Sequence, residues 1–317
     1  MATVFVSGTL PGDGVARLRA SHDVVQDEAG IRSAAFATCR AQVEAVVALL
    51  TDRIDSHFLG GSPRLRVVAN VAVGVDNVDL AACRARGVLV TNTPDVLTDA
   101  TADLAFGLLL AAARRIAEGD RLVRAGAFTG WTPTFMLGAR VNGTTLGIVG
   151  MGRIGQAVAR RARGFDMRVL YTQRKRLPSP VEAELGITFV GPLDELLGSA
   201  DSVSIHCPLT PETRHLFDAA RFARMKRGAV LVNTARGPIV DEEALAGALT
   251  SGALAAAGLD VFEDEPRVDP ALLGCPNAVL APHIGSADRP TREAMAGTAV
   301  ANVLEVLAGR AALTPVG

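Results

Sequence analysis

The chain has 317 residues, of which 49% are hydrophobic and 21% are charged, and its formal net charge at pH 7 is −1. This length allows two domains of ordinary size, and the composition excludes an intrinsically disordered chain. No basic face suggests nucleic acid, and the longest apolar stretch, Leu104–Ala113, is too short to cross a membrane. The cysteines lie far apart without metal-ligand spacing, so we expect reduced thiols, a cytoplasmic protein and no metal site. These cysteines are Cys39, Cys83, Cys207 and Cys275.

Strands and helices alternate over residues 1–91, which is typical of a parallel α/β domain. Strands are expected at Thr3–Val6, Val46–Leu50, Arg66–Val71 and Val88–Thr91. Helices are expected at Val15–Ala20, Ile54–Leu59 and Leu80–Arg86. One long helix should then run from about Leu97 to Ala125, followed by a loop, 126–142, that holds the only tryptophan, Trp131. A loop of this length is usually functional or part of an interface.

The next stretch predicts a dinucleotide site. A buried strand, Thr145–Val149, leads into Gly150, Gly152 and Gly155 in G-x-G-x-x-G spacing, and the chain continues as a helix and a second strand, Arg168–Tyr171. The first glycine permits the tight turn, the second lets the backbone approach a pyrophosphate, and the third lets helix and strand pack closely. The N–H groups at the helix N-terminus would hold the phosphates, and Arg153 and Ile154 belong to this site.

The end of the second strand bears on the choice of cofactor. An NAD-binding unit usually has Asp or Glu there, which binds the ribose hydroxyls. This chain has Gln173, followed by Arg174, Lys175 and Arg176. Cations attract a 2′-phosphate, and Arg binds it bidentately, so we favour NADP(H) and keep NAD(H) as possible. The alternative is a solvated basic loop.

More α/β units follow. Strands are expected at Thr188–Val190, Ser202–His206, Ala229–Asn233, Ala256–Leu259 and Ala278–Ala281, and helices at Leu193–Leu197, Ala219–Met225 and Glu242–Ser251. A last helix, Arg289–Ala308, is expected to return to the first domain.

Three polar residues lie just past strand ends of the nucleotide domain, where open α/β sheets bind ligands: Arg236, Glu265 and His283. Each alone has an ordinary structural explanation. Together they suit hydride addition to a 2-keto acid. Arg would bind the carboxylate and the carbonyl oxygen, and His would donate a proton. Glu would orient the His and favour its protonated form.

These motifs resemble the D-isomer-specific 2-hydroxyacid dehydrogenases over essentially the whole chain. The resemblance rests on NVAVGVDNVD (70–79), TADLAFGLLLA (101–111), GIVGMGRIG (147–155), HCPLTPETRHLF (206–217), NTARGPIVDEEAL (233–245), GLDVFEDEP (258–266) and PHIGSA (282–287). Within the family the chain is most similar to glyoxylate and hydroxypyruvate reductases. The resemblance implies two Rossmann-like parallel-sheet domains, a substrate domain of residues 1–96 plus 288–317 and an NAD(P)-binding domain of residues 97–287.

The resemblance also implies roles for residues. The family's catalytic Arg, Glu and His fall on Arg236, Glu265 and His283. The backbone of Val73 and Gly74 would bind the substrate carboxylate, with Arg236. Cofactor-lining positions fall on Thr101, Pro208, Thr213, Thr234, Ala235, Asp260 and Gly285, with Asp260 expected to hold the nicotinamide amide. In the reductases the loop tryptophan, here Trp131, reaches the partner's active site, which implies a homodimer.

Other functions stay open at this point. Phosphite dehydrogenases are similar in the GW-x-P loop and in PHIGSA, but they have a lysine where this chain has Val73. An NAD(H)-sensing corepressor would carry added segments or lack part of the catalytic set, and all three positions are filled here. The substrate side-chain pocket is undetermined, with Val73, Trp131 and Phe135 as candidates.

Overall fold

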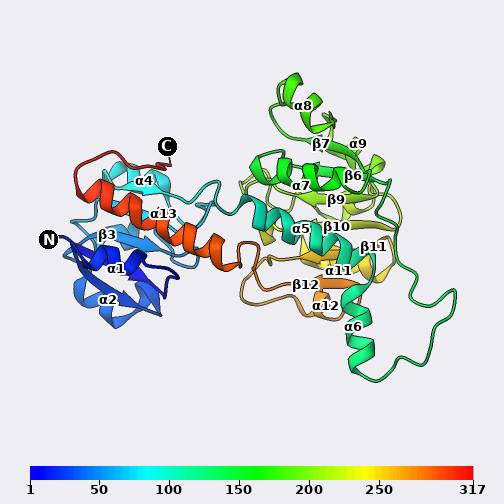
Figure 1. Ribbon diagram of the computed structural model, residues 1–317, viewed down its shortest axis with the longest axis horizontal. Coiled ribbons are helices and arrows are strands. Elements are labelled where there is room, and N and C mark those ends of the chain that lie inside the picture. Colours follow the sequence, from blue (N-terminus) through cyan, green and yellow to red (C-terminus); the bar gives the residue numbers. More distant parts are fainter. Residues whose placement is uncertain (317) are drawn as a thin grey trace. The chain divides into compact units, whose positions relative to one another are not determined.

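The computed structural model describes residues 1–316 and divides them into two compact units. Unit 1 comprises Met1–Leu97 and the chain from Ser286 onward, and unit 2 comprises Thr98–Gly285. The sequence predicts these boundaries after residue 96 and before residue 288. Figure 1 shows the elements of each unit.

Unit 1 is built on a five-stranded parallel sheet in the order β2-β1-β3-β4-β5. Its strands are β1 (Thr3–Ser7), β2 (Asp23–Asp27), β3 (Val43–Ala48), β4 (Val67–Asn70) and β5 (Leu89–Thr91). Its helices are α1 (Gly14–Arg19), α2 (Ala34–Cys39), α3 (Ser56–Gly60), α4 (Leu80–Ala85) and α13 (Arg289–Leu307), with a 3₁₀ turn, η1 (Gly30–Arg32). The last helix, α13, packs against α1, β3 and β4, so unit 1 combines the first elements of the sequence with its last helix (Figure 1).

Two elements of unit 1 were not predicted, β2 and α2. Strand β2 has the sequence DVVQD and lies at the sheet edge, where none of its residues is fully buried. An edge strand needs no continuous apolar run, so its sequence carries little of the signal that marks β1 or β3. Ser33 caps α2 by accepting a hydrogen bond from the N–H of Phe36, but the helix is too short to show a clear period.

Unit 2 is built on a seven-stranded parallel sheet in the order β12-β11-β10-β9-β6-β7-β8. Its strands are β6 (Thr145–Val149), β7 (Arg168–Thr172), β8 (Ile187–Phe189), β9 (Ser202–Ile205), β10 (Ala229–Asn233), β11 (Leu254–Leu259) and β12 (Ala278–Leu280). Its helices are α5 (Thr98–Ala113), α6 (Ile116–Arg124), α7 (Arg153–Arg163), α8 (Ser179–Leu185), α9 (Leu193–Ser199), α10 (Ala219–Phe222), α11 (Glu242–Thr250) and α12 (Pro270–Leu273), with a 3₁₀ turn, η2 (Gly237–Ile239).

Helices cover both faces of this sheet, with α5 and α7 on one apolar cluster and α9, α10 and α11 on the other. Both faces are buried, so β6 and β10 are mostly apolar runs without alternation, whereas β9 (SVSI) alternates in sequence and buries its two serines as well. The strand order reverses between β6 and β9, which is the switch point where doubly wound sheets bind ligands. The predicted class, two parallel-sheet α/β domains, is confirmed.

The prediction of one helix from Leu97 to Ala125 is wrong. The segment forms α5 and α6, separated by Arg115, which has a left-handed backbone with φ of 55°. The N–H of Ala139 donates to the carbonyl oxygen of Ala113 at 2.8 Å and takes the acceptor that the next helical turn would need. A tertiary contact therefore ends the first helix within a sequence of good helix formers. Along the described residues, no helix is both long and apolar enough to span a bilayer.

Candidate active site

The glycine-rich turn between β6 and α7 has the backbone that its sequence requires. Gly150 has φ of 95°, and a Cβ there would lie 2.6 Å from the backbone nitrogen of Cys207 on the neighbouring strand end. A Cβ on Gly155 would lie 2.3 Å from the carbonyl oxygen of Gly150. At Gly152 a Cβ would meet nothing within 4 Å, so the backbone there faces open space at the N-terminus of α7. Open space at this point is what a pyrophosphate needs.

Gln173 ties the loop after β7 to the glycine-rich turn. Its side-chain oxygen accepts a hydrogen bond from the N–H of Met151 at 3.0 Å, and its amide nitrogen donates to the carbonyl oxygen of Lys175 at 2.6 Å. Arg174 and Lys175 are exposed next to it. Where an acidic residue would present a free carboxylate to a ribose, this chain has a side chain whose oxygen is engaged and two exposed cations.

Arg176 is engaged differently from its two neighbours. Its guanidinium forms two hydrogen bonds with Glu182 of α8, at 2.9 and 2.7 Å, and lies 5.6 Å from the ring centroid of Phe189. The buried Tyr171 hydroxyl donates to Glu182 at 2.6 Å and accepts from the N–H of Leu177 at 2.9 Å. The Arg176 and Tyr171 bonds hold the pKa of Glu182 at about 2. Arg176 therefore holds this loop to α8 through Glu182, a role that its position in the sequence did not indicate.

His283 and Glu265 are brought together by the ends of β11 and β12. The His283 Nδ1 lies 2.8 Å from Glu265 Oε2, and the two side chains are 28% and 30% exposed. Glu265 Oε1 accepts a hydrogen bond from the N–H of Phe262 at 3.0 Å. Burial raises the pKa of the Glu265 carboxyl, but the bond to His283, the N–H of Phe262 and the charge of Arg236 outweigh burial and leave that pKa below its ordinary value. The carboxylate is therefore ionised at neutral pH.

Arg236 enters the same region from the end of β10. Asn233, the last residue of β10, accepts from the N–H of Ala235 at 3.0 Å and donates to the carbonyl oxygen of Arg236 at 2.9 Å. The following residue, Gly237, lies against the loop after β11, where a Cβ would be 1.9 Å from the carbonyl carbon of Phe262. This close approach brings the half-buried Arg236 beside the loop that carries Glu265.

Asp260 holds the backbone that follows His283. Its two carboxylate oxygens accept from the N–H groups of Ile284 and Gly285, both at 2.7 Å, and the residue is 1% exposed. Burial raises the pKa of this carboxyl, against the two N–H groups, which lower it. Thr101 of α5 lies next to Gly285, whose added Cβ would be 3.4 Å from the threonine methyl. In this structure Asp260 therefore fixes the turn at His283, which has φ of 55°.

His206, which directly follows β9, differs from His283. Burial lowers the pKa of His206 to about 4, so its ring is neutral at pH 7, and its Nε2 lies 2.8 Å from the Ser204 hydroxyl.

Two threonines predicted to line the cofactor differ in their contacts. The Thr213 hydroxyl has a structural role, because it accepts from the N–H of Thr210 and donates to the carbonyl oxygen of Pro208, both at 2.7 Å. By contrast, the Thr234 hydroxyl is buried without a hydrogen-bond partner among the described residues.

The two substrate-binding candidates of unit 1 lie in the loop after β4. The Asn92 side-chain amide donates to the carbonyl oxygen of Val73, and that of Asn70 donates to the carbonyl oxygen of Gly74, both at 2.9 Å. Val73 itself is 37% exposed. The loop is therefore held by side chains on both flanks, while the apolar side chain of Val73 stays at the surface.

Trp131 lies in an extended arm of unit 2, residues 125–140, that leaves the end of α6 (Figure 1). Its side chain is 77% exposed, and Phe128 and Phe135 of the same arm are 5.9 Å apart between ring centroids. Helix α6 has no buried residue among Ile116–Arg124. The arm thus presents aromatic side chains to the surface instead of covering unit 2.

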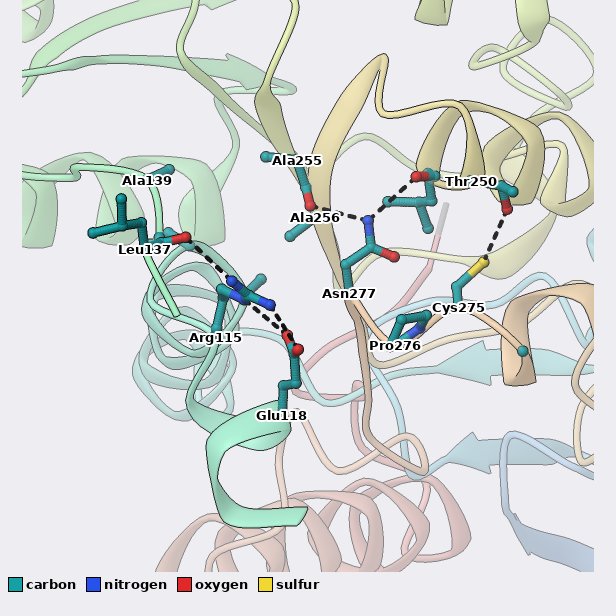
Figure 2. Close-up of a pocket in the computed structure, with 15 residues that line it drawn as sticks. Arg115, Glu118, Leu137, Ala139, Thr250, Ala255, Ala256, Cys275, Pro276 and Asn277 are labelled. Carbon is teal, nitrogen blue, oxygen red and sulfur yellow. Dashed lines mark hydrogen bonds and ion pairs between the residues drawn. The ribbon is translucent and has the colours of Figure 1, made fainter. Parts of the chain in front are cut away.

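A cavity of about 670 Å³ lies at the amino ends of β11 and β12. Figure 2 shows Ala255 and Ala256 at the start of β11, with Asn277 and Cys275 beside them and the Arg115–Glu118 ion pair across the space. Asp260, Glu265 and His283 follow the other ends of these strands. This cavity is therefore separate from the candidate active site. Among the described residues, side chains that bind metals do not gather in groups of three.

Comparison with known proteins identifies the family. Residues 106–285 match the model of the D-isomer specific 2-hydroxyacid dehydrogenase, NAD binding domain. The chain belongs to this family. It is 48% identical over 307 residues to a glyoxylate reductase of Thermococcus onnurineus, covering 95% of this chain and 91% of the relative. The protein is thus an oxidoreductase that acts on the CH–OH group of 2-hydroxy acids, as its sequence motifs predicted.

Solved structures agree with the family in fold. A Thermus thermophilus protein, TT0316, superposes with a TM-score of 0.92 at 48% identity, covering 99% of this chain and 100% of that one. An NADPH-dependent glyoxylate/hydroxypyruvate reductase from Sinorhizobium meliloti, in complex with NADP and malonate, superposes with a TM-score of 0.89 at 36% identity, covering 100% of this chain and 97% of that one.

The residues present fit a nicotinamide dinucleotide. The open backbone at Gly152 and the N-terminus of α7 suit the pyrophosphate. The Thr234 hydroxyl, buried without a partner among residues 1–316, lies in the turn after β10, at the carboxyl ends of the strands, where these sheets bind ligands. Two residues that support the site were not found from sequence, Glu182 and Glu242. Both are buried acids on helices, and only their tertiary partners reveal what they hold.

Proposed function

We propose that this protein is an NADPH-preferring reductase of small 2-keto acids, with glyoxylate or hydroxypyruvate as substrate. The observation that carries the proposal is the 2.8 Å pair of His283 with an ionised Glu265, next to Arg236, at the carboxyl ends of neighbouring strands. A proton donor and a fixed cation are the two groups that reduction of a 2-keto acid requires of the protein.

The arrangement assigns a role to each group. A bound nicotinamide cofactor supplies a hydride. As the keto carbon takes up the hydride, charge grows on the carbonyl oxygen, and Arg236 stabilises that charge. The Nδ1 of His283 faces Glu265, so Nε2 is the nitrogen that donates the proton to this oxygen and completes the 2-hydroxy acid. We assign the substrate carboxylate to Arg236.

The preference for NADPH is proposed from the loop after β7. Arg174 and Lys175 are exposed beside Gln173, and an anionic 2′-phosphate finds cations there instead of a carboxylate. The similarity to the NADPH-dependent reductase of Sinorhizobium meliloti supports the same choice. Arg176 contributes indirectly, by holding the loop through Glu182.

We further propose that the enzyme is a cytoplasmic homodimer. The support for a cytoplasmic location is that its cysteines are free thiols. The support for a dimer is the apolar surface of α6 and its arm, which a second copy would cover. The exposed side chains of this surface are Ile116, Val123, Phe128, Trp131 and Leu137. Sedimentation of the wild type and of Trp131→Ser tests this, because a monomer in both would refute the dimer.

The deciding assay is the initial rate of NADPH and NADH oxidation with glyoxylate, hydroxypyruvate, pyruvate and phenylpyruvate. We expect the highest kcat/KM with NADPH and with glyoxylate or hydroxypyruvate. Equal use of NADH would refute the cofactor assignment and leave the reductase assignment intact. If no keto acid is reduced while NAD⁺ reduction by phosphite proceeds, the substrate assignment is wrong.

A further inference from the structure

One buried carboxylate holds both ends of the loop that carries Glu265. Glu242 is the first residue of α11 and is 7% exposed. Its Oε1 accepts a hydrogen bond from the N–H of Glu263 at 2.6 Å, and its Oε2 accepts from the N–H of Asp269 at 3.4 Å. Glu265 lies between these two residues in the sequence. A side chain outside the loop therefore closes the loop at its base.

The same segment connects this anchor to Arg236. From Arg236 the chain passes through η2 and reaches α11, and Gly237 in that passage packs directly on Phe262. Asp241 already caps α11 by accepting from the N–H of Ala244 at 2.9 Å. The helix therefore does not need Glu242 as a cap, and both oxygens of that residue serve the loop instead.

The charges around Glu242 make its two hydrogen bonds important. Burial raises the pKa of Glu242, the two N–H groups lower it, and the nearby carboxylates of Glu263 and Asp269 raise it further. On the outer side of the loop, Glu263 Oε1 lies 2.6 Å from His215 Nε2 and 3.7 Å from Arg214. A buried carboxylate with two acidic neighbours is costly unless it is hydrogen-bonded, and here the bonds that stabilise it are those that fix the loop.

We propose that Glu242 is a positioning residue of the reaction: by holding the N–H groups of Glu263 and Asp269, it fixes the Glu265 carboxylate against Nδ1 of His283. It touches neither substrate nor cofactor and acts only through Glu265. This inference rests on the proposed function, because it requires His283 to be the proton donor.

The test compares Glu242→Gln with Glu243→Gln, the adjacent exposed acid on the same helix turn. Glutamine keeps the shape of the side chain but accepts only one of the two N–H groups, and its NH₂ faces the other donor. We expect kcat to fall about tenfold, which corresponds to about 1.4 kcal/mol. The KM for NADPH should stay unchanged, because the glycine-rich turn is untouched. Glu243→Gln should behave as wild type.

A double variant separates positioning from general destabilisation. In a Glu265→Gln background, Glu242→Gln should change kcat far less than it does in the wild type, because the two act through one group. Additive effects would overturn the proposal, as would an unchanged kcat with only a lowered Tm. Glu242→Asp keeps the charge but is too short to reach both amides, so it should recover part of the activity.

Two measurements keep the proposal testable if Glu242→Gln does not fold. In the wild type, the amides of Glu263 and Asp269 should exchange hydrogen slowly for a loop, and exchange as fast as in unstructured chain would refute the anchor. His283→Asn, measured in parallel, tests the proposed function separately. If His283→Asn keeps full turnover, the proposed function fails whatever Glu242 does.

Discussion

The loop after β7 gives a prediction that separates three neighbouring cations. All three side chains are exposed, but only Arg176 is paired with Glu182, through two hydrogen bonds. A hydrogen bond to a charged group contributes about 1.5–3 kcal/mol. Because the side chains of Arg174 and Lys175 are exposed, we take the lower end, which corresponds to about tenfold in kcat/KM for each residue.

We therefore expect the double variant Arg174→Ala/Lys175→Ala to lose about 100-fold in kcat/KM with NADPH and little with NADH. Arg176→Gln should lower Tm and reduce the ratio of NADPH to NADH efficiency far less than the double variant does. The assay is the initial rate with glyoxylate and each cofactor, at low and at high salt. The NADPH preference of the wild type should decrease with salt, because the contacts are exposed. An unchanged ratio in the double variant would refute the assignment of this loop to the 2′-phosphate.

Two further predictions concern the nucleotide unit. Gly155→Ala should lower Tm, because the added Cβ would lie 2.3 Å from the carbonyl oxygen of Gly150 and overpacking costs about 1–3 kcal/mol. Gly152→Ala, where the added Cβ meets nothing within 4 Å, should keep Tm but weaken NADPH binding in a fluorescence titration. The pKa of Glu182 is lowered from 4.5 to about 2, so its contribution to stability is present above pH 4.5 and is lost as the pH falls toward 2. Glu182→Gln should remove this pH dependence from acid unfolding curves. An acid unfolding curve identical to that of the wild type would contradict this prediction.

The best-predicted part of the fold is the unit from β6 to β7. Its apolar strand, three glycines and second strand all agree in register, and the structure has β6 at Thr145–Val149 as expected. Local sequence carries this information because the strand is buried on both faces and the turn admits only glycine at Gly150 and Gly155. The edge strand β2 lacks these constraints, which explains why it was not predicted.

The interactions between distant segments were not predictable in the same way. The break between α5 and α6 depends on Ala139, and the sequence around Arg115 favours a continuous helix. The ion pair of Arg176 with Glu182 and the two hydrogen bonds of Glu242 likewise join elements whose approach only the fold determines. The residues proposed for catalysis could be found because the carboxyl ends of parallel strands lie on the same side of the sheet. This rule needs only the order of the strands in the sequence.

The central claim is that His283, held by Glu265, donates the proton in the reduction of a 2-keto acid. The most direct test is the turnover of His283→Asn with NADPH and glyoxylate, together with NADPH binding by fluorescence. We predict a fall in kcat of about 10²–10⁴, the usual contribution of a general acid, with the Kd for NADPH unchanged. Turnover near that of the wild type, with NADPH bound normally, would contradict this account.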